Sequence, residues 1–176
     1  AGFTQKVNEV IEYVQMEDNT YKLIEVLKKE KVYEHDGKVV LCDTAVKMQS
    51  KFHQIFSGTV KTEDGEYIIF DTSKIKHIKK NYTGKKIAIF YKFIAEGEMI
   101  RTEFEKTTQD PFEFNASGPE VVFYRQYQSG REGINLSSAD FIIFVALDFS
   151  AISYLQSKER MMALNREKKA VAVYLI

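Results

Sequence analysis

The sequence is poor in the residues that mark disulfide scaffolds and loop-rich linkers. It has one cysteine, Cys42, and two prolines, Pro111 and Pro119, in 176 residues. A single cysteine cannot form an internal disulfide, and its place in the apolar run 39–42 predicts a buried thiol in a reducing compartment, which we expect to be the cytoplasm. No apolar stretch approaches the roughly 18 residues that a membrane-spanning helix needs, and no signal-peptide pattern opens the chain. We therefore expect no membrane partner.

Neither sign of charge predominates. Lysine and arginine together number 25, as do aspartate and glutamate, so the formal net charge is zero. Binding to nucleic acid must therefore depend on a local basic patch, because the field of the whole chain is close to zero. The histidines His35, His53 and His77 are scattered without a second ligand at short spacing, and we expect no metal site among them. Hydrophobic residues make up 44%, which is enough for one domain with a core of ordinary size.

The sequence also lacks the phosphate-binding pattern Gly-x-x-x-x-Gly-Lys-Ser/Thr. The stretch Thr83-Gly84-Lys85-Lys86 has only a superficial similarity to it. It precedes an apolar run, whereas a phosphate loop follows a strand and opens a helix, so we interpret it as a turn. No paired acidic motif after an apolar run suggests a Mg²⁺ site either. We therefore expect that the chain alone does not hydrolyse ATP.

The segment 1–70 shows short elements of mixed type. Apolar residues recur at three- and four-residue spacing between Val7 and Leu27, so we predict that the segment 1–30 is helical. A strand is expected over 38–42, followed by a helix that ends near Phe56. The dipeptide Asp64-Gly65 is a two-residue turn signal and predicts a β-hairpin over 59–70. We interpret the segment 1–70 as an N-terminal linking region of helices and a β-hairpin.

From residue 71 onward, apolar strands alternate with helical segments. Strands are predicted at four places and helices between them, and the segment 107–118, which holds Pro111 and adjoins Pro119, is the most loop-like part of the chain. The expected strands cover residues 87–91, 121–124, 141–147 and 171–176. Alternating strands and helices imply right-handed crossovers and a parallel sheet, and continuous apolar strands imply cover on both faces. We therefore predict an α/β domain over 71–176, an open parallel sheet with helices on both faces.

Ligands of such sheets bind at the carboxyl ends of the strands. The residues to inspect are therefore those that follow the apolar runs, namely 92–93, 126–135 and 148–150. The densest polar segment, 128–140, contains two glycines, which permit positive φ angles and let backbone N–H groups approach a phosphate or ribose. From the chemistry alone, this segment is either a tight connection that needs glycine or a phosphate-binding loop.

The order of motifs in this part of the chain resembles a known family. Gly-x-x-Gly-Ile-Asn-Leu-x-x-Ala at 130–139 is followed by an apolar strand, by Asp148-Phe149 and by a segment with Gln156 and Arg160. This order resembles helicase motifs five and six of the Swi/Snf group, and residues 85–93 resemble motif four. Ser73-Lys74-Ile75 fits the short helix that leads into motif four. The resemblance covers about 72–176 and implies the C-terminal RecA-like lobe of a superfamily-two DNA helicase or translocase.

The resemblance also implies a division of labour between two lobes. In this family the first lobe carries the phosphate-binding loop and the acidic Mg²⁺ residues, and the second lobe closes over ATP and supplies arginines to its phosphates. A guanidinium in that place stabilises the charge that develops on the transferring phosphoryl group. The expected partners are therefore the first lobe of the same protein, which this chain does not contain, and DNA, with RNA less favoured. ATP would be shared between the lobes, and Mg²⁺ is expected only in the full-length protein.

Candidate site residues follow from the resemblance and from the strand ends. The candidate catalytic arginines are Arg160 and Arg166. The family usually has a second arginine at the position of Ala163, so the identity of the arginine finger stays open. The candidate nucleotide-binding residues are Gly130, Glu132, Gly133, Asn135 and Gln156. The candidate nucleic-acid contacts are Tyr91, Lys92, Ser137 and Ser138.

Two alternatives stay open. The first is a nucleotide- or partner-binding α/β module without motor activity, in which the loop 130–135 holds a small phosphorylated ligand. The second concerns the basic cluster Lys74, Lys76, Lys79 and Lys80, which is either a solvated helix face or a contact to a phosphate backbone. The segment 107–120 is shorter than its counterpart in the family, so some nucleic-acid contacts of that element are expected to be absent or supplied differently.

Overall fold

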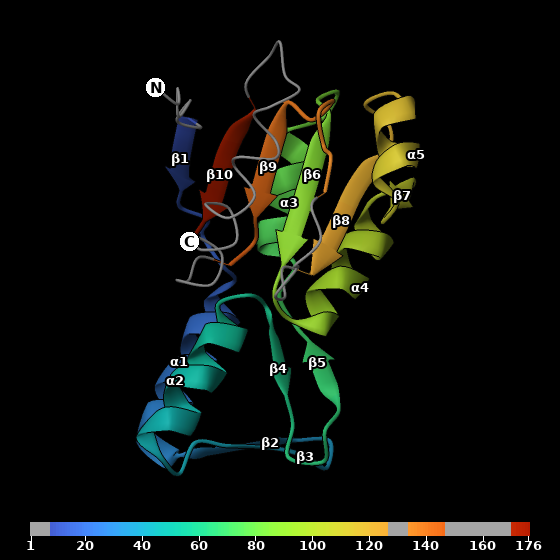
Figure 1. Cartoon of the computed structure of the whole chain (residues 1–176). Coiled ribbons are helices and arrows are strands. Elements are labelled where there is room, and N and C mark those ends of the chain that lie inside the picture. Colours follow the sequence, from blue (N-terminus) through green and yellow to red (C-terminus); the bar gives the residue numbers. More distant parts are fainter. Residues whose placement is uncertain (1–7, 127–133, 147–169) are drawn as a thin grey trace, which may run out of the picture.

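A six-stranded parallel sheet forms the centre of the protein (Figure 1). The computed structural model describes residues 8–126, 134–146 and 170–176. The strand order is β1-β10-β9-β6-β8-β7, and every neighbouring pair is parallel. The strands are β1 (Asn8–Glu12), β6 (Ile87–Tyr91), β7 (Thr107–Thr108), β8 (Val122–Gln126), β9 (Phe141–Phe144) and β10 (Val171–Leu175). The predicted α/β class and parallel sheet are confirmed.

The central strands are apolar throughout because both faces of the sheet are buried. Every residue of β6 is buried. Phe90 packs with Phe123 and Phe144 in a cluster on one face, whereas Ile89 belongs to a second cluster with Ile143 on the other. Successive side chains of a strand point to opposite faces, so a strand covered on both sides needs apolar residues at every position.

Each face of the sheet has its own cover. Helices α3 (Ser73–Asn81) and α4 (Ile94–Glu103) pack on one face, with Ile78 and Ile100 fully buried there. The short helix α5 (Pro111–Ala116) and the residues before β9 pack on the other, where Phe114 and Leu136 are fully buried. The chain therefore builds an open sheet between two layers, as the sequence predicts.

The prediction of a loop over 107–118 was wrong in part. This segment contains β7 at the sheet edge and helix α5. Pro111 occupies the start of α5, where a missing N–H costs nothing, and the Asp110 carboxylate accepts a hydrogen bond from the Phe112 N–H at 2.9 Å. Proline therefore begins a helix here instead of marking a loop.

The prediction of helix across the segment 1–30 was also wrong in part. Residues 8–12 form β1, which pairs with β10 along its whole length, and Asp18–Glu30 is helical, as α1. Val10 and Ile11 are neighbours in this strand and are 42% and 52% exposed. The strand at the sheet edge therefore lacks the alternation of buried and exposed residues that would have indicated it in the sequence. The strand thus joins a segment of the predicted linking region to the main sheet.

Residues between α1 and α3 form a smaller unit beyond the carboxyl ends of the strands (Figure 1). We call it the α1–β5 unit; besides α1 it contains β2 (Val32–His35), β3 (Lys38–Leu41), α2 (Ala45–Ile55), β4 (Thr59–Lys61) and β5 (Tyr67–Ile69). Its core includes the fully buried Leu27, Val40 and Ile55. The hairpin β4–β5 is confirmed, but its turn covers residues 63–65 instead of two residues, because the Thr62 N–H donates to the Glu66 carbonyl and Gly65 has a φ of 87°. The strand β2 was not predicted. Cys42 is a buried free thiol, as expected, and burial raises its pKa.

A buried aspartate joins the α1–β5 unit to the lobe. Asp71 is 2% exposed and precedes α3. Its Oδ2 accepts hydrogen bonds from the Glu17 N–H at 2.8 Å and the Thr20 hydroxyl at 2.5 Å, and its Oδ1 accepts one from the Ser73 N–H at 2.9 Å. The bond from Ser73 satisfies an N–H in the first turn of α3, and the other two reach the residue before α1 and a hydroxyl in its first turn. One carboxylate thus fixes the two helices relative to each other.

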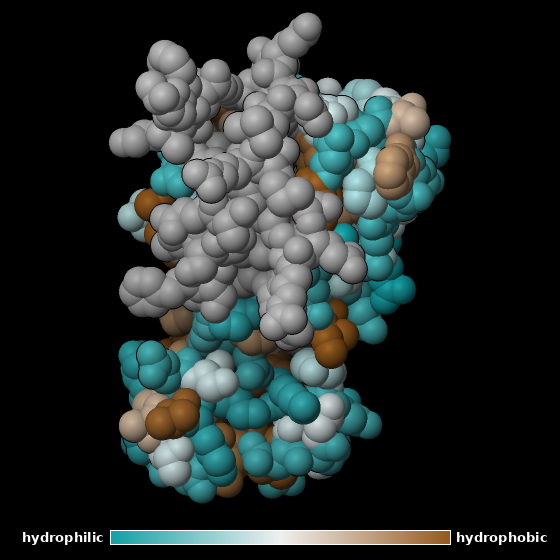
Figure 2. Space-filling model, viewed as in Figure 1, coloured by the Kyte–Doolittle hydropathy of each residue, from teal (hydrophilic) through white to brown (hydrophobic). Residues whose placement is uncertain are grey.

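The visible surface of the α1–β5 unit is mainly hydrophilic, with separate apolar spots (Figure 2). Among the described residues, the apolar side chains that are most exposed lie apart in the sequence: Phe112 at 86%, Tyr13 at 82% and Val46 at 78%. In the parts of the chain that the structure describes, no helix has the length and apolar character to cross a membrane.

Candidate functional site at the carboxyl ends of the central strands

The strand order creates a switch point between β6 and β9. After β6 the chain runs through α4 toward β8 on one side, whereas β9 is followed in sequence by β10 on the other. Loops that leave adjacent parallel strands in opposite directions open a crevice at their carboxyl ends, which is where open α/β sheets bind ligands. The sequence did not reveal this point, because strand order is not readable from it.

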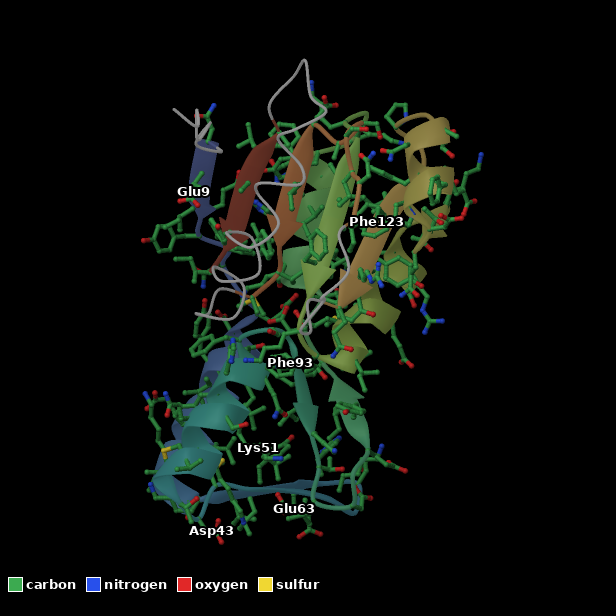
Figure 3. All side chains as sticks on the ribbon, viewed as in Figure 1. Glu9, Asp43, Lys51, Glu63, Phe93 and Phe123 are labelled. Carbon is green, nitrogen blue, oxygen red and sulfur yellow. The ribbon has the colours of Figure 1, made fainter. Side chains whose placement is uncertain are left out.

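Lys92 lies at this point, as predicted. Lys92 and Phe93 directly follow β6, and the Val145 N–H after β9 donates a hydrogen bond to the Phe90 carbonyl at 3.1 Å. The Gln126 side chain at the end of β8 donates to the Lys92 carbonyl at 2.6 Å. Phe93 lies between the sheet and the α1–β5 unit (Figure 3), with its ring 5.2 Å from that of His53 in a T-shaped contact. Three strand ends and α2 therefore meet around Lys92.

Tyr91 does not share this position. It is 8% exposed and belongs to the cluster on the face covered by α3 and α4. Its ring stacks on Tyr124 at 6.1 Å, and it lies so close to Gly97 that a Cβ there would be 2.7 Å from Tyr91 Cζ. The structure does not support Tyr91 as a nucleic-acid contact, because alternation along β6 directs this side chain into the core.

Glu96 lies beneath the loop that carries Lys92. It is fully buried in the first turn of α4, and its Oε1 accepts hydrogen bonds from the Phe93 N–H at 2.7 Å and the Lys92 N–H at 3.1 Å. Its Oε2 has no hydrogen-bond partner among the described residues. Burial raises the pKa of Glu96 to about 7, although the two N–H groups, the Lys74 ammonium and the Ser57 hydroxyl all favour the charged form.

Lys74 is the cation that acts on this carboxylate in the core. It is 5% exposed on α3, and its Nζ donates to the Val145 carbonyl at 3.2 Å. Burial lowers the pKa of Lys74, whereas the charges of Glu96 and Asp71 oppose that shift. The expectation of a solvated basic face therefore fails for Lys74, which points inward from a helix whose other lysines are not buried. Sequence spacing gave no sign of it, because lysines are usually exposed.

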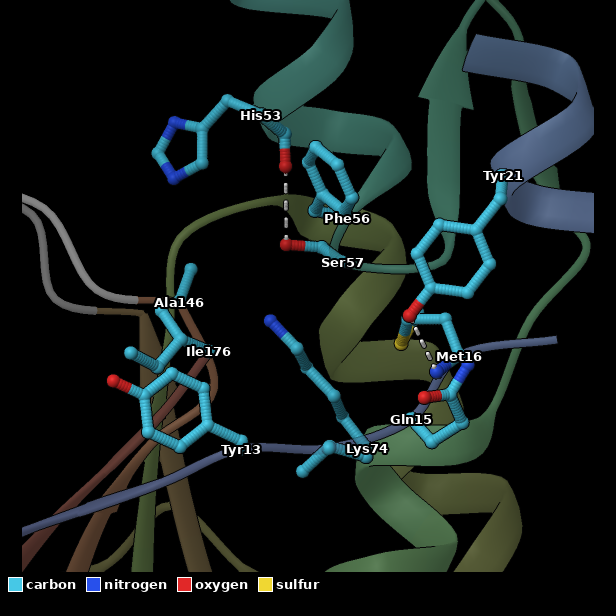
Figure 4. Close-up of a pocket in the computed structure, with 11 residues that line it drawn as sticks. Tyr13, Gln15, Met16, Tyr21, His53, Phe56, Ser57, Lys74, Ala146 and Ile176 are labelled. Carbon is cyan, nitrogen blue, oxygen red and sulfur yellow. Dashed lines mark hydrogen bonds between the residues drawn. The ribbon is translucent and has the colours of Figure 1, made fainter. Parts of the chain in front are cut away.

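A cavity of about 630 Å³ adjoins this cluster (Figure 4). It lies where the carboxyl ends of β1, β9 and β10 face the α1–β5 unit. Four aromatic rings, those of Tyr13, Tyr21, His53 and Phe56, lie in its wall, and the Lys74 ammonium points into it toward Ser57 (Figure 4). The lining residues are Tyr13, Val14, Gln15, Met16, Tyr21, His53, Phe56, Ser57, Lys74, Ala146 and Ile176. Its volume falls within the range of roughly 300–1,000 Å³ that small-molecule pockets occupy.

Asn135, Ser137 and Ser138 lie at the opposite end of the sheet. Asp140, which leads into β9, donates its N–H to the Lys86 carbonyl before β6 at 2.7 Å, so this segment is at the amino ends of the strands. The length of β6 separates the segment from Lys92 by about 16 Å. The prediction that residues up to Asn135 lie at the ligand end was therefore wrong for Asn135, and the structure does not bring the two serines together with Lys92.

The turn at Asn135 is held by a residue that the sequence did not suggest. Asn115 of α5 donates from Nδ2 to the Asn135 carbonyl at 2.8 Å. Its Oδ1 accepts from the Ser138 N–H at 3.2 Å and from the Ser138 hydroxyl at 2.7 Å. The Asn135 side chain accepts from the Ser137 N–H at 3.0 Å. These polar groups are thus engaged in building the turn.

The remaining candidate residues lie outside the described residues. They are Gly130, Glu132, Gly133, Gln156, Arg160 and Arg166. Within the described ranges, no three side chains among His, Cys, Asp and Glu come together in a way that suits a metal ion.

No family model matches the sequence, and no curated protein matches it. Solved structures do resemble it. The SWI2/SNF2 ATPase core of Sulfolobus solfataricus in complex with dsDNA is 18% identical with a TM-score of 0.60, and the match covers 96% of this chain and 40% of that chain. The same core domain solved alone gives 18% identity, a TM-score of 0.60 and coverage of 96% and 39%. The SWI2/SNF2 ATPase C-terminal domain from the same organism is 17% identical with a TM-score of 0.56, and the match covers 96% of this chain and 78% of that chain.

These likenesses show the fold. The chain has the RecA-like architecture of a SWI2/SNF2 ATPase C-terminal domain, as the motif order predicts. It spans about 40% of the length of the ATPase cores that it matches. The match covers nearly the whole chain, so the α1–β5 unit is included in it.

Proposed function

We propose that this chain is the second motor lobe of an ATP-dependent DNA helicase or translocase. The supporting observation is its fold likeness, over 96% of its length, to the C-terminal domain of a SWI2/SNF2 ATPase. The motif order between residues 128 and 166 supports the same conclusion independently of the coordinates. The proposal includes a first lobe in the full-length protein, which binds ATP with Mg²⁺.

The chemistry assigned to this lobe is closure over the nucleotide. An arginine that reaches across from the second lobe stabilises negative charge on the transferring phosphoryl group, and its planar fork suits phosphate oxygens. We assign this role to Arg160, with Arg166 as the second candidate. Gly130, Glu132 and Gly133, in the motif-five loop, carry the nucleotide-facing backbone, and Gln156 completes the candidate set. Asn135 is left out of this set because it lies at the amino ends of the strands.

The proposed polynucleotide is DNA, with RNA less favoured. One of the similar proteins is solved in complex with dsDNA. In this chain Lys92 supplies a local cation at the switch point, which a protein of zero net charge needs in order to bind a phosphate backbone. Tyr91 is excluded from this surface by its burial, and the serines at 137 and 138 are separated from it by the length of β6.

The test uses the full-length protein with its first lobe. Arg160→Ala should lower DNA-stimulated ATP hydrolysis by a factor of about 10³ while nucleotide binding persists, since an arginine finger acts on the transition state. Arg166→Ala, measured beside it, identifies which arginine acts. Arg101→Ala is the matched control, because Arg101 is exposed on α4 and pairs only loosely with Glu98 at 3.9 Å. Unchanged turnover in both Arg160→Ala and Arg166→Ala would contradict the assignment.

The cavity beside Lys74 favours the alternative of a ligand-binding α/β module without motor activity. It is concave, mostly apolar and close to a buried charge, as small-molecule sites are. Calorimetry with ATP, ADP and AMP on this chain separates the two. A motor lobe by itself should bind them weakly, whereas micromolar binding that Phe56→Ala abolishes and Arg160→Ala leaves intact would favour the module.

A further inference from the structure

The backbone on both sides of the switch point is held by two buried side chains of opposite charge. Glu96 binds the N–H groups of Lys92 and Phe93 after β6, and Lys74 binds the carbonyl of Val145 after β9. The two side chains come from different helices, α4 and α3. The sheet itself pairs β6 with β9, and these two side chains hold the backbone just beyond the two strand ends.

A carboxylate is a costly way to cap α4 at this depth. Glu96 is fully buried, and Oε2 has no hydrogen-bond partner among the described residues. A buried charge costs free energy even when it is paired, and a neutral side chain would satisfy the same two N–H groups with less desolvation. The charge is therefore better explained by its effect on the loop than by capping alone.

Other titratable groups lie close to Glu96 and Lys74, and an experiment must distinguish their effects from that of the Glu96 charge. The His53 ring of α2 contacts Phe93, and the charge of Glu96 contributes to the raised pKa of the Tyr91 phenol of β6. On the side of α3, Asp71 acts on Lys74. Histidine side chains ordinarily titrate close to neutrality, so a control must retain His53 while Glu96 is changed.

We propose that Glu96 and Lys74 are positioning residues for Lys92. The charged carboxylate fixes the loop that presents Lys92, and the ammonium stabilises that charge while it holds the end of β9. The inference rests on the proposed function, because Lys92 is taken as a contact to the polynucleotide backbone. Neither Glu96 nor Lys74 needs to touch the polynucleotide.

The position of the loop should depend on pH with a defined sign. The pKa of Glu96 lies near neutrality, so the carboxylate is charged above about pH 7 and neutral below it. Hydrogen bonds to a charged acceptor are stronger than those to a neutral acid. The N–H groups of Lys92 and Phe93 are therefore held firmly on the alkaline side and less firmly on the acid side.

The first experiment follows the backbone N–H resonances of Lys92 and Phe93 by NMR between about pH 6 and about pH 8.5, a range that spans histidine titration as well. Both should titrate together in the native chain and stay flat in Glu96→Gln, which keeps an acceptor oxygen and retains His53. Lys74→Met should move the midpoint to higher pH, because the ammonium favours the charged carboxylate. Glu98→Gln, with its side chain 59% exposed on the same helix, should change nothing.

The second experiment measures the affinity for a labelled DNA duplex by fluorescence anisotropy at constant ionic strength. Relative to Glu96→Gln, the native chain should gain about tenfold in affinity from the acid to the alkaline end, the worth of one charged hydrogen bond. If the N–H groups titrate but DNA is never bound, the proposed function fails while the control of the loop stands.

An N–H titration that persists in Glu96→Gln comes from another group and overturns the inference. If Glu96→Gln does not fold, the double variant Lys74→Met/Glu96→Gln removes both buried charges together, which buried pairs often tolerate. That variant should fold and show flat N–H resonances. A titration there with the native midpoint would likewise overturn the inference.

Discussion

Asp71→Asn should loosen the attachment of the α1–β5 unit to the lobe. The native carboxylate accepts three hydrogen bonds, two of them at Oδ2 from the Glu17 N–H and the Thr20 hydroxyl. Asparagine replaces one oxygen with an amide that donates. If Oδ1 keeps its bond to Ser73, the new N–H₂ faces a backbone donor and a hydroxyl, so both bonds at Oδ2 are lost or reversed.

The free energy of unfolding should fall by about 3 kcal/mol, since a hydrogen bond to a charged group contributes about 1.5–3 kcal/mol. Part of the second bond is recovered, because the Thr20 hydroxyl can rotate to accept from the new amide. Urea denaturation at neutral pH measures the decrease. Hydrogen exchange in α1 should rise as well, because the start of the helix loses its attachment to Asp71. The control is Asp43→Asn, an exposed pair with Lys47 at 2.9 Å that should change stability by less than about 0.5 kcal/mol.

The pH dependence of Asp71 gives a second measure with a fixed sign. Burial alone would raise the pKa of Asp71, but hydrogen bonds from Ser73, Thr20 and Glu17 outweigh it and hold the pKa below the ordinary 3.8. A lowered pKa in the folded state adds stability above the unfolded value, and this contribution disappears as pH falls through the folded value. The native chain should therefore lose more stability in acid than Asp71→Asn. A difference below about 1 kcal/mol at neutral pH would refute the reasoning.

Three further changes test other parts of the structure. Lys92→Ala should weaken DNA binding and reduce the slope of log affinity against log salt by about 1, measured by anisotropy, and an unchanged slope would remove Lys92 from the interface. Lys86→Met should lower the stability measured by thermal unfolding by about 2–3 kcal/mol. The reason is that Nζ donates to the carbonyls of Ser117 and Gly118 and lies 4.1 Å from the Phe114 ring centre. A stability equal to that of the native chain would show that other contacts hold α5 in place. Gly58→Ala should lower the free energy of unfolding in urea by about 3 kcal/mol or more. At this position φ is 84°, and a Cβ would stand 1.7 Å from the Asp71 carbonyl oxygen. A small decrease would mean that this turn can rearrange.

One residue of the candidate site, Lys92, was open to prediction, and the reason is local. Lys92 directly follows an apolar run, and in parallel sheets the residues after such runs gather at one edge. Tyr91 was misassigned because a strand end is not by itself an exposed position, and Gly97, which receives its ring, lies on the next helix. The positions of Lys74 and Glu96 could not be predicted, since charged residues on amphipathic helices are exposed in most proteins.

The sequence by itself determined the elements whose signals lie within a few residues of one another. The buried strand β6 and the β-hairpin over 59–70 both belong to this group. Periodicity and turn chemistry depend on neighbours along the chain, so they survive without knowledge of the fold.

Only the tertiary structure decided the features that depend on partners distant in sequence. The segment 8–12 became a strand because β10, close to the other end of the sequence, offers it an edge. The switch point between β6 and β9 and the buried pair of Lys74 and Glu96 exist only once the strands are ordered and two helices pack on the same face. Strand pairing and side-chain burial depend on which surfaces meet in space, and the spacing of residues along the chain does not indicate this.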